Sequence, residues 1–223
     1  MTGHAHHHGA TPAVETGHQT PASKLLITLA LVGAVSGALV VSVYKLTLPA
    51  VQRYAGQRVE LAIREVLKAP ARWDTLYLVN GALVATAPEG VDRGELPKAY
   101  VGHDQNGKRL GVAVTAQEPG FQEELSLMIG FDPASGGLTG ITVLDQKETP
   151  GLGDKIETDS GFGGQFEGRV PPLRGVKGKS PADRSEVQTI TGATISSRAV
   201  IRIVNHAVAR WAPLVEAFDR TRR

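Results

Sequence analysis

The pattern of hydrophobic and polar residues changes three times along the chain and divides it into four segments. Residues 1–23 are small and polar with no apolar period, which predicts a disordered tail. Residues 24–45 are almost continuously apolar, residues 46–70 have apolar positions near helical spacing, and residues 71–223 combine strand-like and helix-like periods. The pattern predicts a tail, a transmembrane helix, a stalk helix and one folded domain of class α+β.

The apolar segment has the length of a membrane span. No charged residue occurs from Leu25 to Val43, and Lys24 and Lys45 bracket the run. As a helix, this run would extend roughly 28 Å, about one hydrocarbon core. A buried helix of a soluble protein would be shorter and less uniformly apolar, and a cleaved signal peptide would be followed by a small-residue cleavage site. We therefore expect a single membrane anchor, followed by a stalk helix that Pro70 stops.

The folded domain begins with a period of two, interrupted by turn residues. Asn80-Gly81 and Asn106-Gly107 each separate two apolar runs, and a third turn is expected at Pro133–Gly137. Asn-Gly between alternating runs is a strong hairpin signal. These segments predict an antiparallel sheet rather than alternating strand–helix units.

The second half of the domain has less regular patterning. Residues 145–188 are rich in Gly, Pro and Lys and show little periodicity, which is typical of a functional or disordered loop. From Ser197 to Phe218 the apolar positions form one helical stripe, with a kink expected at Pro213. The expected architecture is thus an antiparallel sheet with flanking helices.

Composition removes several classes of function. The net charge is +2 and 21% of residues are charged, so no broad basic field indicates nucleic-acid binding. The absence of Cys excludes disulfides, thiolate catalysis, zinc–thiolate sites and cysteine-ligated iron–sulfur clusters. The "GVKGKS" stretch has Leu173 where a phosphate-binding P-loop needs its first glycine. Catalytic residues and metal ligands are therefore not predicted.

Two stretches remain that can carry chemistry, "DQKETPGLGDKIE" at 145–157 and "TGATISSRAV" at 191–200. In the first, Gly151 and Gly153 permit positive φ and close approach of the backbone to a flat ligand. The second places hydroxyls and free N–H groups at a helix N-terminus, which favours a phosphate. Taken alone, the residues are equally consistent with a glycine turn and a helix N-cap that has more hydroxyl side chains than a cap needs.

Together these two stretches resemble the FMN-binding domain of the G subunit of the Rnf electron-transport complex. The related C subunit of the sodium-pumping NADH:quinone reductase carries a similar pair, and the layout of tail, anchor, stalk and single domain also matches. The resemblance implies that a flavin transferase moves FMN from FAD onto the last threonine of the motif as a phosphoester. That residue is Thr194.

The resemblance also implies the rest of the cofactor site. The loop from Glu148 to Gly153 is expected to lie against the isoalloxazine, and Lys177 or Lys179 to offset the phosphate charge. Thr191, Ser196 and Ser197 are interpreted as turn and cap residues whose amides serve the phosphate. The family often has an acidic residue where this chain has Gln188, which bears on how efficiently the flavin is attached. The expected cofactor-binding set is Thr194, Glu148, Thr149, Leu152, Gly153, Lys177, Thr191, Gly192, Ala193 and Ser197.

The function implied is that of a membrane-anchored electron-transfer subunit with covalent FMN in an ion-translocating ferredoxin:NAD oxidoreductase, not a self-sufficient catalyst. Its expected partners are the other membrane and iron–sulfur or flavin subunits and the flavin transferase. The charge bias across the anchor weakly favours a cytoplasmic domain. The resemblance instead implies the bacterial inner membrane with the FMN domain in the periplasm. The alternatives are a protein like the C subunit of the quinone reductase and a non-redox membrane-anchored binding or scaffold protein.

Overall fold

The computed structural model describes residues 21–178 and 180–221. Most of the predicted tail, and Lys179, therefore lie outside the described residues. The chain divides into two compact units, residues 1–52 and 53–223. Each unit is described by itself.

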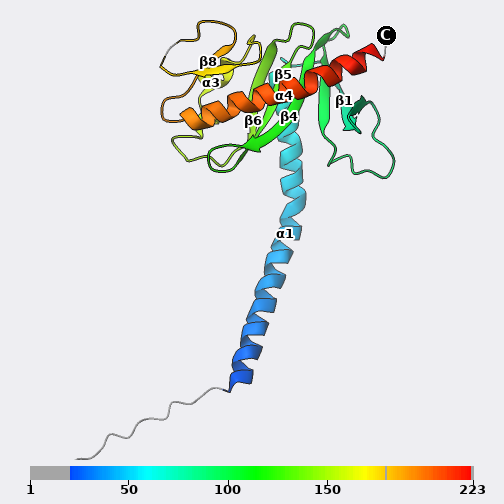
Figure 1. Ribbon diagram of the computed structural model, residues 1–223. Coiled ribbons are helices and arrows are strands. Elements are labelled where there is room, and N and C mark those ends of the chain that lie inside the picture. Colours follow the sequence, from blue (N-terminus) through cyan, green and yellow to red (C-terminus); the bar gives the residue numbers. More distant parts are fainter. Residues whose placement is uncertain (1–20, 179, 222–223) are drawn as a thin grey trace, which may run out of the picture. The chain divides into compact units, whose positions relative to one another are not determined.

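A single helix, α1 (Ala22–Val66), takes up the segments predicted as membrane helix and stalk (Figure 1). Pro49 lies inside this helix without ending it. The helix ends at Val66, four residues before Pro70, and the next turn is closed by Lys68 and Ala69 at positive φ, 59° and 56°. The helix stop is thus made by a left-handed turn that precedes the proline.

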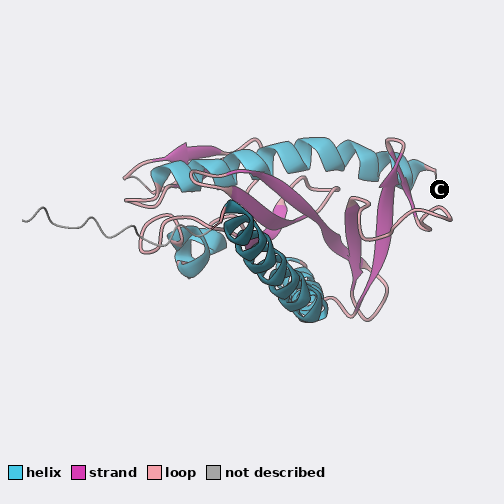
Figure 2. Cartoon of the chain, turned by 90° about the horizontal axis from the view of Figure 1, so that it is seen from below, coloured by secondary structure: helices cyan, strands magenta, loops and turns pink. Residues whose placement is uncertain are grey.

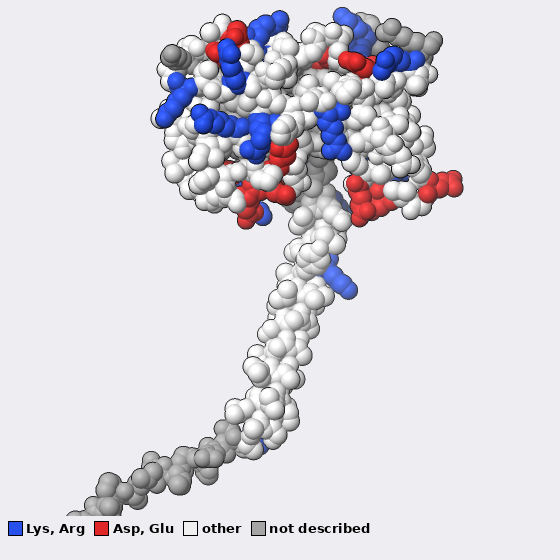
Figure 3. Space-filling model, in the orientation of Figure 1, with Lys and Arg blue, Asp and Glu red and all other residues white. Residues whose placement is uncertain are grey.

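Within the first unit, α1 is long and apolar enough to cross a membrane by length and composition. Its most apolar window of 18 residues has a mean hydropathy of 2.4, and none of that window is buried. In the space-filling view α1 is white over nearly its whole length, whereas Lys, Arg, Asp and Glu are interspersed over the second unit (Figure 3). Apolar side chains exposed in this way require a nonaqueous surround or a partner.

The second unit is built on a six-stranded antiparallel sheet of order β2-β1-β3-β4-β5-β6. The Asn80-Gly81 turn has both residues at positive φ, 50° and 80°, as a two-residue hairpin requires. All three predicted hairpins are present, since β1 pairs with β2, β3 with β4 and β5 with β6. The strands are β1 (Arg72–Val79), β2 (Ala82–Val84), β3 (Lys98–His103), β4 (Arg109–Pro119), β5 (Glu124–Phe131) and β6 (Leu138–Asp145).

Helices cover both faces of the sheet. The long C-terminal helix α4 (Thr194–Arg220) runs along one face (Figure 2), where Val204 and Trp211 join the main core with Leu127 and Ile129. On the other face, Ile63 and Val66 of α1 and Leu67, which follows the helix, are buried against Ala113 and Met128. Burial of these apolar stripes is the main stabilising term. The predicted α+β class and the predicted C-terminal helix are confirmed.

The stretch predicted to lack regular structure, residues 145–188, contains four short elements. Phe162 and Phe166 anchor it in the main core, with their rings edge to face at 5.4 Å between centroids. A parallel pair of strands leads the chain into the second motif, because Thr189, just past the pair, donates its N–H to Val176 O at 2.8 Å. The elements are α2 (Lys155–Thr158), α3 (Ser160–Gly164), β7 (Arg174–Val176) and β8 (Glu186–Gln188).

Candidate cofactor site

An open cleft of about 350 Å³ lies where the start of α4 meets the loop after β6 and the turn between β4 and β5. Both motifs singled out from the sequence line this one cleft. Its lining residues are Phe121, Glu148, Thr149, Leu152, Gly153, Lys177, Gly192, Ala193, Thr194, Ile195 and Ser196.

Thr194 is the first residue of α4, and the N-terminus of that helix opens into the cleft. The N-cap residue is Ala193, whose side chain offers no capping oxygen. Within the part of the chain that the structure describes, no acceptor is recorded for the N–H groups of Thr194, Ile195 and Ser196. A helix of 27 residues with unsatisfied N–H groups at its start attracts an anion.

The prediction that Ser196 and Ser197 are cap residues is wrong. The helix begins at Thr194, so both serines lie within its first turns and are buried. Ser197 Oγ accepts from Ile190 N–H at 3.1 Å and donates to Ala193 O at 2.8 Å, which fixes the turn before the helix. Ser196 Oγ donates to the Glu148 carboxylate at 2.8 Å. Their hydroxyls therefore hold the two motifs in place and leave the helix N-terminus uncapped.

Thr191 lies in the exposed turn before α4, as predicted, but away from this cleft. It lines a neighbouring cavity with Gln165 and Gln188 instead. Ser197 also lies outside the cleft lining, beneath the turn that it fixes. Of the ten residues expected at the cofactor, the structure brings together the other eight.

Glu148 is a buried carboxylate at the centre of the site, only 4% exposed. Its Oε1 accepts from the N–H groups of Phe121, at 2.7 Å, and Gln122, at 3.3 Å. Its Oε2 accepts from Ser196 Oγ. One side chain thus joins three segments: the β4–β5 turn, the loop after β6 and the start of α4. A buried carboxylate is tolerated because several donors compensate for its lost hydration.

Gly153 is required here by packing against Glu148. A Cβ at this position would lie 2.7 Å from Glu148 Oε2 and 2.9 Å from Ser196 Oγ, closer than such atoms approach. Gly151, by contrast, has φ of 76° and open space around it, so it serves the turn. Gly153 is therefore needed because of close packing, whereas Gly151 is needed for the backbone conformation of the turn.

Exposed apolar side chains form the walls of the cleft. Leu152 is 49% exposed, Phe121 58% and Ile195 59%. Leu152 lies beside the second motif, since a Cβ at Gly192 would be 3.6 Å from its Cδ2. Sequence reasoning missed Phe121 and Ile195, because a turn residue and an outward-facing helix residue belong to no buried period. Three bare apolar groups around one cleft are suited to a flat apolar ligand.

Polar groups complete the rim. Thr149 Oγ1 accepts from Gln122 Nε2 at 2.8 Å, so this side chain is held in position. Lys177 follows β7 directly, is exposed, and makes no recorded ion pair with any described residue. Its ammonium is therefore available to a bound anion.

Comparison with known proteins identifies the class of domain to which the cleft belongs. The FMN-binding domain family matches residues 120–209, which include every lining residue of the cleft. The fold is similar to that of the crystal structure of Shewanella oneidensis NqrC, with a TM-score of 0.60 at 20% identity over 73% of this chain and 99% of that one. A second similar structure, the C subunit of the Na⁺-translocating NADH-quinone reductase from Parabacteroides distasonis, gives 0.57 at 19% identity, covering 75% and 96% of the two chains. The chain thus contains an FMN-binding domain.

Curated relatives define the family more narrowly. The G subunit of the Na⁺-translocating ferredoxin:NAD⁺ oxidoreductase complex of Acetobacterium woodii is 31% identical over 189 residues, covering 83% of this chain and 89% of that protein. The G subunit of the ion-translocating oxidoreductase complex of Escherichia coli K12 is also 31% identical, covering 81% and 86%. The chain belongs to this family of G subunits, and its apolar helix makes it a membrane-anchored member.

The chemistry of the residues that line the cleft fits FMN. Leu152, Phe121 and Ile195 offer apolar surface to a ring, while Lys177 and the free N–H groups of α4 offer charge and donors to a phosphate. Thr149 offers a polar group on the rim. Thr194 lines the cleft at the start of α4, where those N–H groups lie.

Proposed function

We propose that the protein is the FMN-carrying electron-transfer subunit of an Rnf-type ion-translocating complex, with the cofactor esterified to Thr194. A separate flavin transferase would supply FMN from FAD: the Thr194 hydroxyl loses its proton, a bond forms between its Oγ1 and the phosphorus on the flavin side, the pyrophosphate bond breaks, and AMP leaves. The observation that carries this proposal is the position of Thr194 at an uncapped helix N-terminus inside the cleft.

The chain's own residues bind and orient the cofactor in this proposal. Bound FMN would supply the acceptance and release of single electrons. Glu148 already accepts three hydrogen bonds within the protein, so it is occupied in holding the loop. An ester linkage suits an open cleft, because a cofactor tethered there is not lost to solvent. We therefore propose a redox subunit of a larger complex rather than an enzyme that acts alone.

The attachment site is tested by substituting one threonine at a time. Full-length wild type, Thr194→Ala and Thr191→Ala are each co-expressed with a flavin transferase and separated on a denaturing gel. Because only covalent flavin survives denaturation, the wild-type band should fluoresce. Thr191→Ala, a matched change three residues away outside the cleft, should fluoresce equally, and Thr194→Ala should be dark. Fluorescence in Thr194→Ala would refute the assignment.

We further propose that the FMN domain faces the periplasm. The chain has no cysteine, so a single introduced thiol reports its own location. Gln105→Cys, in the exposed turn between β3 and β4, should react with a membrane-impermeant maleimide in intact spheroplasts, whereas Ser23→Cys, before the anchor, should react only after lysis. The reverse pattern would place the domain in the cytoplasm.

A further inference from the structure

The outer edge of β6 is open over half its length. β6 is the last strand of the sheet, so only its inner edge pairs with β5. On the outer edge, Leu138 is bonded at both groups: its N–H donates to Arg169 O and its O accepts from Gly168 N–H, each at 2.8 Å. From Gly140 to Val143, no described residue outside the sheet is recorded as a partner of the strand backbone. Unpaired strand edges are the usual place where another chain adds.

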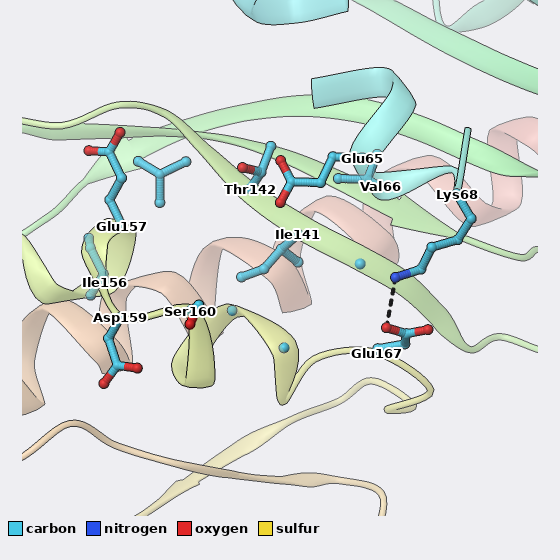
Figure 4. Close-up of a pocket in the computed structure, with 14 residues that line it drawn as sticks. Glu65, Val66, Lys68, Ile141, Thr142, Ile156, Glu157, Asp159, Ser160 and Glu167 are labelled. Carbon is cyan, nitrogen blue, oxygen red and sulfur yellow. Dashed lines mark hydrogen bonds and ion pairs between the residues drawn. The ribbon is translucent and has the colours of Figure 1, made fainter. Parts of the chain in front are cut away.

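A groove of about 280 Å³ follows this open stretch (Figure 4). One wall is the end of α1, which is fixed to the strand because Thr139 Oγ1 donates to Val66 O at 2.6 Å. The other wall is formed by α2 and α3, and the Lys68–Glu167 ion pair, 2.7 Å between Nζ and Oε2, closes one end. The groove shares no lining residue with the cofactor cleft. The walls thus flank the edge without covering it.

The groove is negatively charged. Four carboxylates line it, Glu65, Glu157, Asp159 and Glu167, against one cation, Lys68. Glu157 and Glu167 each have an ion-pair partner, Arg58 and Lys68, and Asp159 caps α3. Glu65 is exposed on the rim, with no ion pair recorded to a described residue. An occupant with Lys or Arg side chains would complement this charge.

We propose that the groove binds an extended, basic segment of another subunit, which adds to β6 as a further strand. Main-chain pairing with Gly140–Val143 supplies the affinity, and the carboxylates select for basic side chains. This inference rests on the proposed function, because it requires that the chain works inside a complex. The surface would hold the FMN domain beside its partner while the cofactor cleft stays open.

Photocrosslinking in the assembled complex tests the occupant directly. Ser160, on the α3 wall, is replaced by p-benzoylphenylalanine in full-length protein within native membranes, and Gln105 is replaced in a matched control. We expect a crosslink from position 160, but not from 105, to a Lys- or Arg-rich segment of a different subunit, identified by sequencing the crosslinked peptide. A crosslink to lipid, to a second copy of this chain or to a non-basic segment would overturn the proposal, as would none at all. The last outcome would mean that the walls only protect the edge.

Charge reversal tests the selectivity. Glu65→Lys should weaken retention of the subunit in the solubilised complex roughly fivefold at low salt, with the difference shrinking in high salt. Glu89→Lys, an equal charge change in the exposed loop after β2, should leave retention unchanged. The fluorescent flavin band should be normal in both variants. Equal retention of the two variants overturns the groove proposal alone, whereas a dark wild-type band overturns the proposed function.

Discussion

The hydroxyl of Ser196 donates a hydrogen bond to the carboxylate of Glu148, with 2.8 Å between Oγ and Oε2, across 48 residues of sequence. This bond joins the loop after β6 to the first turn of α4. The protein's own hydrogen bonds thus join the two motifs directly, and several predictions depend on that connection.

Removing the Glu148 carboxylate should destabilise the domain. Glu148→Ala leaves the buried Ser196 hydroxyl and the N–H groups of the β4–β5 turn without this acceptor, at a cost of about 1–3 kcal/mol in the free energy of unfolding. Glu148→Gln keeps an acceptor oxygen and the side-chain volume, so its loss should be smaller. Thermal unfolding of the full-length protein in detergent measures both. Equal melting temperatures for wild type and Glu148→Ala would contradict the bridging role.

Enlarging Gly153 should disturb the same bridge without touching the attachment threonine. Gly153→Val forces Glu148 and Ser196 apart, since even a Cβ would lie 2.7–2.9 Å from their atoms. We expect a loss of about 1–3 kcal/mol in stability, retained covalent fluorescence, and a shifted flavin midpoint potential. Potentiometric titration of the full-length protein measures the shift.

The control for that variant is Gly151→Asn. Gly151 has open space and positive φ, a conformation that Asn tolerates. Its potential should stay close to that of the wild type. If Gly153→Val also left the midpoint potential at the wild-type value, the loop would matter only as a turn.

The sequence predicted what depends on local chemistry. Asn80-Gly81 and Asn106-Gly107 fixed two hairpins, and the apolar stripe from Val200 to Trp211 fixed the long helix. Sequence reasoning missed the start of this helix, because Ser196 and Ser197 are good caps in isolation. In the folded protein, the Ser196 hydroxyl bonds to Glu148 and the Ser197 hydroxyl bonds to the turn at Ile190.

The four short elements within residues 145–188 were not predicted from the sequence for a related reason. Phe162, Phe166 and Leu173 are buried by contact with distant parts of the core, and they follow no period of their own. The cleft walls at Phe121 and Ile195 exist only once separate segments meet. Tertiary contacts of this kind cannot be recognised from local spacing in one sequence.

Leu152 should tune the cofactor without contributing much to folding. It is half exposed, so Leu152→Ala should change the free energy of unfolding by less than about 0.5 kcal/mol. Its loss should nevertheless expose the ring to water and shift the flavin absorption maximum and midpoint potential. Val91→Ala, also at an exposed apolar residue but in the loop after β2, should change neither. A flavin spectrum and potential unaffected by Leu152→Ala would remove this residue from the site.

Lys177 should assist attachment of the flavin through its charge. Among the described residues, it is the one cationic side chain that lines the cleft with Thr194, and its exposure to solvent limits its contribution to at most about 1 kcal/mol. Lys177→Gln should therefore slow flavin attachment by a purified transferase and FAD up to about fivefold, and the difference should fade as salt screens the charge. Lys108→Gln, an equally exposed lysine in the turn between β3 and β4, is the matched control and should react at the wild-type rate. A salt-independent effect of Lys177→Gln would mean that the residue acts through packing, and an unchanged rate would mean that Lys177 does not offset the phosphate charge.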